Sequence, residues 1–74
     1  MAKSRYETGI VKWYDDFKGC GIILCDRGGE VDVHYSAILC GDGDCVLKEG
    51  NRVQFIIFKG LKGPQAQDVM VMDE

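Results

Sequence analysis

A short segment of the chain gathers the residue types that bind unpaired nucleic-acid bases. Aromatic rings stack on bases and lysines neutralise phosphates, so aromatic residues interleaved with lysines are typical of proteins that bind single strands. The candidates in this segment are Lys12, Trp13, Tyr14, Lys18, His34 and Tyr35. Later in the chain, Lys62 could contact a phosphate and Gln65 a base edge. These eight residues predict a nucleic-acid-binding surface.

The centre of the same segment offers different chemistry. Cys20, Asp32 and His34 would share one face of two antiparallel strands, where neighbouring side chains lie about 5 Å apart. Cysteine, histidine and carboxylate are zinc ligands, and a thiol beside an imidazole can act as a nucleophile. Because Cys20 and Cys25 are an odd number of residues apart, however, they face opposite sides of a strand. We therefore expect no metal, no cofactor and no catalytic residue.

Composition restricts the classes of function. The 74 residues form one domain, 46% of them are apolar, and the net charge is -3, so any nucleic-acid binding depends on a local basic patch. No apolar run approaches the roughly 20 residues of a membrane helix. The polar start, Met1 to Arg5, carries no secretory signal, so we expect a cytoplasmic protein. All four cysteines are accordingly expected to be reduced thiols.

Alternating apolar residues between glycine-rich turns predict five strands. Their expected ranges are Thr8–Tyr14, Cys20–Cys25, Glu30–Tyr35, Asn51–Lys59 and Gln65–Met72. Gly28 and Gly29 suit a hairpin turn, and Ser36 could cap one helical turn over Ser36–Leu39. A chain with five short strands and no long helix favours an all-β fold, closed into a small antiparallel barrel that leaves no sheet edge unpaired.

Five ordered motifs resemble those of bacterial cold-shock proteins. They are Gly9 to Tyr14, Lys18 to Gly21, Asp32 to Ile38, Glu49-Gly50 and Lys62 to Val69. The resemblance covers roughly residues 8 to 71 of a single domain, 1 to 74. It implies a five-stranded oligonucleotide-binding (OB-fold) barrel, the cold-shock domain, that binds single-stranded RNA or DNA without enzymatic activity. It also implies a role as an RNA chaperone or antiterminator.

Three aromatic positions of the family's two binding motifs differ in this chain. Cys20 and Ile22 replace the phenylalanines of the first motif, and Asp32 replaces the first phenylalanine of the second. The long loop has Gly43-Asp44-Cys45 where the family often has an aromatic residue. Each stacked ring contributes about 1–3 kcal/mol, so the three losses should cost on the order of 3–6 kcal/mol. We expect weak, salt-sensitive binding centred on Trp13.

An alternative is an OB-fold module that binds a protein partner and has little or no nucleic-acid binding. If Val53, Phe55 and Ile57 point into the core, Ile56 and Phe58 point away from it. Two such apolar side chains on a small barrel could form a partner surface or a homodimer contact.

Overall fold

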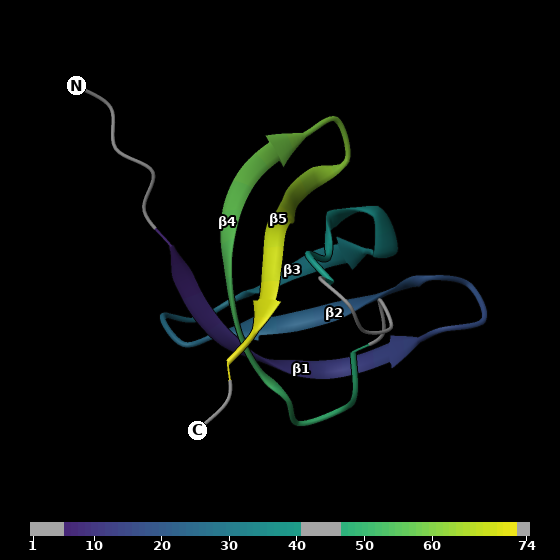
Figure 1. Ribbon diagram of the computed structural model, residues 1–74. Helices are drawn as coiled ribbons and strands as arrows, with labels where there is room; N and C mark the ends of the chain where they lie inside the picture. Colours follow the sequence, from purple (N-terminus) through teal and green to yellow (C-terminus); the bar gives the residue numbers. More distant parts are fainter. Residues whose placement is uncertain (1–5, 41–46, 73–74) are drawn as a thin grey trace.

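The computed structural model describes residues 6–40 and 47–72 (Figure 1). Its elements are β1 (Glu7–Asp15), β2 (Cys20–Cys25), β3 (Glu30–His34), the 3₁₀ helix η1 (Tyr35–Ala37), β4 (Arg52–Gly60) and β5 (Gly63–Val71). These bounds agree with the five predicted strands to within two residues. Within these ranges no helix is long and apolar enough to cross a membrane.

The strands form a closed barrel in the order β1-β2-β3-β5-β4, which confirms the predicted all-β barrel. Neighbouring strands are antiparallel except β3 and β5, which run parallel and pair at Asp32 and Gln65. A second parallel bridge joins Ile38 to Val69. A ring with an odd number of strands cannot alternate direction all the way round. One parallel contact is therefore unavoidable in this barrel.

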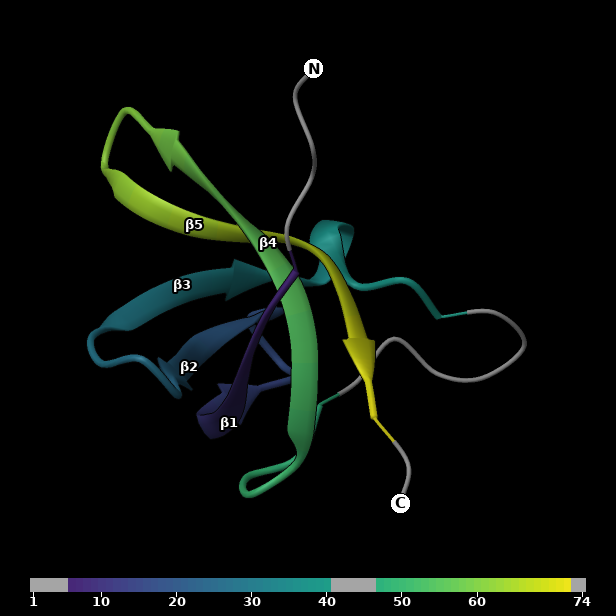
Figure 2. The same cartoon turned by 90° about the vertical axis from the view of Figure 1, so that its left-hand side faces the viewer.

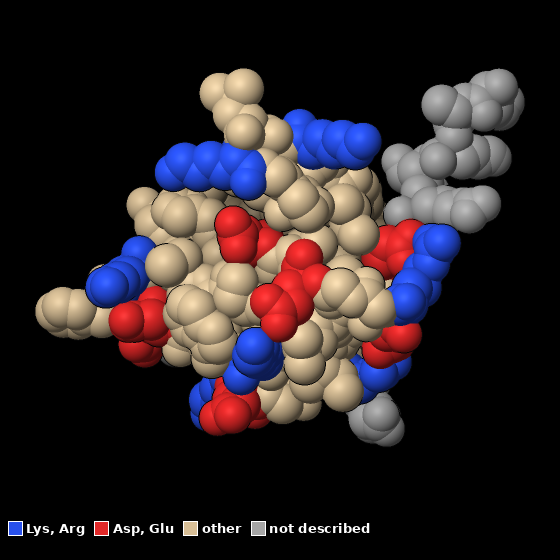
Figure 3. Space-filling view, turned by 180° about the vertical axis from the view of Figure 1, so that it is seen from behind, with Lys and Arg blue, Asp and Glu red and all other residues tan. Residues whose placement is uncertain are grey.

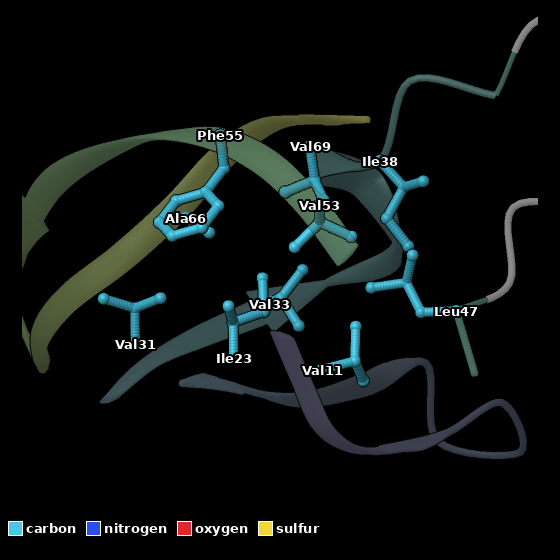
Figure 4. Close-up of a cluster of buried hydrophobic side chains, with 10 residues drawn as sticks. All are labelled: Val11, Ile23, Val31, Val33, Ile38, Leu47, Val53, Phe55, Ala66 and Val69. Carbon is cyan, nitrogen blue, oxygen red and sulfur yellow. The ribbon is translucent and has the colours of Figure 1, made fainter. Parts of the chain in front are cut away.

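The core is built from the inward-facing side chains of every strand (Figure 4). Its buried members are Val11, Ile23, Val31, Val33, Ile38, Leu47, Val53, Phe55, Ala66 and Val69. Phe55 is fully buried and is the bulkiest of them. The expectation that Ile57 is a core residue is wrong: its side chain is 38% exposed and lines a second cavity together with Glu7 and Cys25.

Two turns test the predicted local structure. Gly28 and Gly29 adopt φ angles of 117° and 87°, which confirms the expected glycine hairpin. The predicted cap at Ser36 is wrong. His34 is the extended residue before η1, and its Nδ1 accepts a hydrogen bond from the Ser36 backbone N–H at 3.2 Å. The helical turn therefore starts one residue earlier than expected.

The three cysteines within the described ranges are of two kinds. Cys20 and Cys25 are free thiols, and they line different cavities, as their odd spacing predicts. Burial raises the pKa of the Cys25 thiol, and the negative charge of the nearby Glu7 carboxylate raises it further. Cys40 is disulfide-bonded, so the expectation of four reduced thiols is wrong at that position. The predictions for Met1 to Arg5 and for Gly43-Asp44-Cys45 lie outside the described residues.

Asp26 ties the turn between β2 and β3 to two other strands. Its carboxylate accepts hydrogen bonds from the Thr8 hydroxyl at 2.6 Å and from the two Arg52 guanidinium nitrogens at 3.3 and 3.2 Å. The Asp26 backbone N–H also donates to the Thr8 carbonyl at 2.9 Å. The Thr8 hydroxyl, and then Arg52, lower the pKa of Asp26 below its ordinary value of 3.8.

We predict that Asp26 contributes to the acid sensitivity of the fold. Because its pKa is lower in the folded chain than in the unfolded one, its stabilising effect is present above the ordinary pKa and is lost as the pH falls through the lowered one. Thermal unfolding midpoints measured between about pH 2 and pH 7 should therefore fall less steeply for D26N than for the wild type. The matched variant D32N removes a carboxylate from a different face. A D26N midpoint as pH-dependent as that of the wild type would contradict the prediction.

Candidate nucleic-acid interface

Five residues, one from each strand, form a continuous row across the sheet. The Cα pairings join Trp13 to Ile22, Ile22 to Asp32, Asp32 to Gln65, and Gln65 to Phe58. Cross-strand partners project from the same face of a sheet. All five side chains line one cavity of about 690 Å³ on the outer face of the barrel. We call these five residues the cross-strand row.

Further residues line the same cavity beside the row. Cys20 and His34 are Cα partners on β2 and β3, and both line the cavity together with Asp32. This arrangement confirms the predicted shared face of these three side chains. Lys62, from the turn that connects β4 and β5, lines the cavity as well. The β4–β5 hairpin forms an arm beyond β3 in both ribbon views (Figure 2).

Trp13 reaches the cavity through an irregularity in β1. The register between β1 and β2 shifts between Val11 and Trp13, so Val11 is buried while Trp13 is 44% exposed. Gly21 allows the two strands to approach closely at this point. A Cβ at Gly21 would collide with the Trp13 carbonyl oxygen and would lie 2.8 Å from the Tyr14 Cα. A side chain at position 21 would therefore push β2 away from β1 beside Trp13.

His34 and Tyr35 form an aromatic pair at the cavity edge. Their ring centroids are 4.5 Å apart and the rings are tilted by 31°. Tyr35 packs over Gly19, whose φ of 73° and absent Cβ leave room for the ring. Because His34 Nδ1 accepts from the Ser36 N–H, the neutral imidazole carries its hydrogen on Nε2. A hydrogen-bond donor is thereby held at the site.

Half of the predicted binding residues line the cavity. They are Trp13, His34, Lys62 and Gln65. Tyr35 borders it through its contact with His34. Tyr14 packs partly buried against the core, and burial raises its pKa. Tyr14 follows Trp13 directly on β1 and pairs with Gly21. Successive side chains of a strand face opposite sides of the sheet, so the Tyr14 ring turns inward.

Two predicted phosphate contacts lie elsewhere. Lys12 is paired with Glu30, with 3.0 Å between Nζ and Oε2. Lys18 lies in the turn between β1 and β2, where its backbone N–H donates to Asp15 at 3.3 Å. Acidic and basic side chains are interspersed over the face shown in Figure 3. A phosphate at Lys12 would therefore have to compete with the Glu30 carboxylate.

The sequence interpretation missed the place of Phe58 in this site. We expected Phe58 and Ile56 to point away from the core as a homodimer surface. Phe58 is 40% exposed and lines the cavity at the end of the cross-strand row opposite Trp13. The two-residue turn between Gly60 and Gly63 fixes the hairpin register and so pairs Phe58 with Gln65, a signal that was available in the sequence. Self-association through Ile56 and Phe58 stays a prediction.

The described part of the chain contains no group of three or more histidine, cysteine or acidic side chains placed to hold a metal ion. Cys20, Asp32 and His34 share the cavity but do not form such a group.

Comparison with known proteins identifies the family. The model of the "Cold-shock" DNA-binding domain matches residues 7–72. A cold shock-like protein of Thermotoga maritima is 52% identical over 65 residues, which cover 88% of this chain and 97% of that protein. Cold shock protein CapB of Pseudomonas syringae pv. tomato is 46% identical over 69 residues, which cover 93% and 99%.

A solved structure supports the fold independently. The structure "drosophila Unr CSD456" superposes with a TM-score of 0.77 at 17% identity. The match covers 95% of this chain and 28% of that one. At this identity the likeness concerns the barrel architecture alone.

We predict that Glu30 restrains Lys12 from binding phosphate. The variant E30Q removes the ion pair, so oligonucleotide affinity at low salt should rise by up to roughly fivefold, the range of an exposed ion pair. The dependence of affinity on salt should also steepen. The matched control is E7Q, which removes the 3.1 Å pair with Arg27 beside the second cavity and changes the net charge equally. Equal effects of E30Q and E7Q would show that only net charge matters.

Proposed function

This chain belongs to the cold-shock domain family, and on that premise we propose that it binds single-stranded nucleic acid across the cavity crossed by the cross-strand row. Members of this family are non-enzymatic proteins that bind nucleic acid. The observation that carries the proposal is Trp13, 44% exposed at one end of a cavity that His34, Lys62 and Gln65 also line. These four side chains supply a stacking surface, two donors and a cation.

Each group has a distinct role in the proposed complex. Trp13 stacks on a base, and the Nε2 hydrogen of His34 is donated to a base edge or a phosphate oxygen. Lys62, in the turn at the end of the β4–β5 hairpin, neutralises a phosphate. The amide of Gln65 both donates and accepts, as recognition of a base edge requires.

The centre of the cavity limits the affinity. Cys20 and Ile22 line it with apolar surface but without a ring to stack on. Asp32, exposed beside them, repels a phosphate backbone that passes close to its carboxylate. We therefore propose that the protein binds single-stranded nucleic acid weakly and releases it readily. Ready release suits an RNA chaperone or antiterminator, the cellular role that we propose together with a cytoplasmic location.

A fluorescence titration tests the proposed function directly. The chain has one tryptophan, so quenching reports on Trp13 alone. A pyrimidine-rich octanucleotide added at low salt should quench this fluorescence saturably, with a dissociation constant in the micromolar range or weaker. W13A should lose affinity by roughly 5- to 150-fold, the value of one stacked base, as followed by calorimetry. Absence of quenching up to high micromolar oligonucleotide would contradict the proposal.

The salt dependence separates phosphate contacts from stacking. Each phosphate contact with a single strand contributes about 0.7 to the slope of log affinity against log salt. K62Q should reduce the slope by about that amount, whereas K59Q, which removes an exposed lysine from the neighbouring strand, should leave it unchanged.

The alternative function gives a different result in the same experiments. An OB-fold interaction module that self-associates through Ile56 and Phe58 would show no quenching, and its sedimentation would depend on protein concentration. Quenching by a protein that sediments as a monomer at every concentration excludes this alternative.

A further inference from the structure

The cross-strand row carries an aromatic ring at each end. Trp13 lies on β1 and Phe58 on β4, and three strands separate them in the described sheet order. Neighbouring strands are about 4.8 Å apart, so the path along the curved sheet from one backbone to the other is roughly 19 Å over four steps. The two rings therefore lie at opposite ends of the row, with the side chains of Ile22, Asp32 and Gln65 between them. The two rings are separate surfaces of one cavity.

We propose that Phe58 is a second base-stacking position, which holds a base of the same strand several nucleotides away from the base on Trp13. The inference rests on the proposed function and adds a subsite to it. Phe58 is 40% exposed and faces the cavity, so its ring is accessible to a base without unfolding any part of the barrel. Phe55, three residues earlier on the same strand, is fully buried, so Phe58 is not the phenylalanine of β4 that fills the core.

The surroundings of Phe58 supply the other groups that a nucleotide needs. Gln65 is the cross-strand partner of Phe58, and its side-chain amide lies over Gly60. A Cβ at Gly60 would lie 3.0 to 3.2 Å from the Gln65 amide atoms, so the glycine leaves the room that this side chain occupies. Lys62 lines the same end of the row from the hairpin turn. A ring, an amide and a cation are therefore gathered on one hairpin.

The centre of the row explains why this subsite matters for binding. Ile22 and Asp32 lie between the two aromatic ends and offer no stacking surface. A bound strand therefore stacks at the ends of the cavity and crosses its centre without stacking. A stacked nucleic-acid strand rises about 3.4 Å per nucleotide, so following the roughly 19 Å path along the sheet takes up to about six steps, and an extended strand takes fewer. This length lies within the roughly 4–16 nucleotides that one OB fold binds.

The test compares a long and a short oligonucleotide on the full chain. We predict that F58A weakens binding of an octathymidylate by roughly 5- to 150-fold, the value of one stacked base. A trithymidylate makes only two steps of about 3.4 Å when stacked and so falls short of the path between the two rings, and its binding should stay within twofold of the wild type. Because Trp13 is retained, its fluorescence quenching reports both titrations.

Two matched controls separate stacking from loss of apolar surface. I57A truncates a neighbouring residue of β4 that is 38% exposed but lines the other cavity. F17A removes a ring that is 95% exposed in the turn between β1 and β2. Both variants should bind octathymidylate within twofold of the wild type. F58Y and F58W should keep the wild-type affinity, whereas F58L, which retains apolar bulk without a ring, should resemble F58A.

Cross-linking locates the two bases directly. Octathymidylates with 5-iodouracil at single positions should cross-link to Trp13 and to Phe58 from different positions, several nucleotides apart. Thermal unfolding of each variant confirms that the barrel is intact.

The outcomes distinguish this inference from the proposed function. If the wild type binds octathymidylate and F58A binds it equally well, or if F58L matches the wild type, the second stacking position is wrong while the proposed function stands. If the wild type gives no quenching at all, the proposed function itself is wrong. If F58A alters only the sedimentation of the free protein, Phe58 serves self-association and the inference is overturned.

Discussion

The odd number of strands in the barrel is the constraint on which the proposed binding face depends. Five strands cannot all be antiparallel in a closed ring, and the parallel contact falls between β3 and β5. That contact pairs Asp32 with Gln65 and so joins the β2–β3 hairpin to the β4–β5 hairpin. Without it, the cross-strand row would end at Asp32. The second aromatic end of the cavity therefore exists because of how the barrel closes.

Local register then determines which side chains reach this face. The irregularity after Val11 turns Trp13 outward, and Gly21 lets β1 and β2 come close enough for that pairing. The charged side chains near this face are arranged less favourably for binding a phosphate backbone. Lys12 is held by Glu30 at 3.0 Å, and Asp32 occupies the centre of the row. The face thus combines accessible rings at its ends with a centre that offers little attraction for a phosphate backbone.

Much of this architecture was predictable because alternation and turn chemistry are local properties. The two-residue period placed Asp32 and His34 on one face, and Gly28 and Gly29 marked their hairpin. Long-range contacts were not predictable in the same way. The pairing of Lys12 with Glu30 joins residues 18 apart in sequence. The place of Phe58 at the cavity that Trp13 also lines depends on the pairing of β3 with β5, two strands far apart in the chain.

Because inward and outward side chains alternate along each strand, the residues that stabilise the barrel differ from those on the proposed binding face. On β3, Val31 and Val33 are buried in the core, while Asp32 and His34 project into the cavity. Replacing an outward-facing residue changes the contacts that a nucleic-acid strand could make, but it leaves no void among the buried side chains. On the proposed binding face, Asp32 therefore offers no ring to a base, while the valines on either side of it stay in the core. In the proposed complex, a cold-shock barrel without stacking rings at the centre of this face uses another ring at its edge, because the register places that ring on the same row.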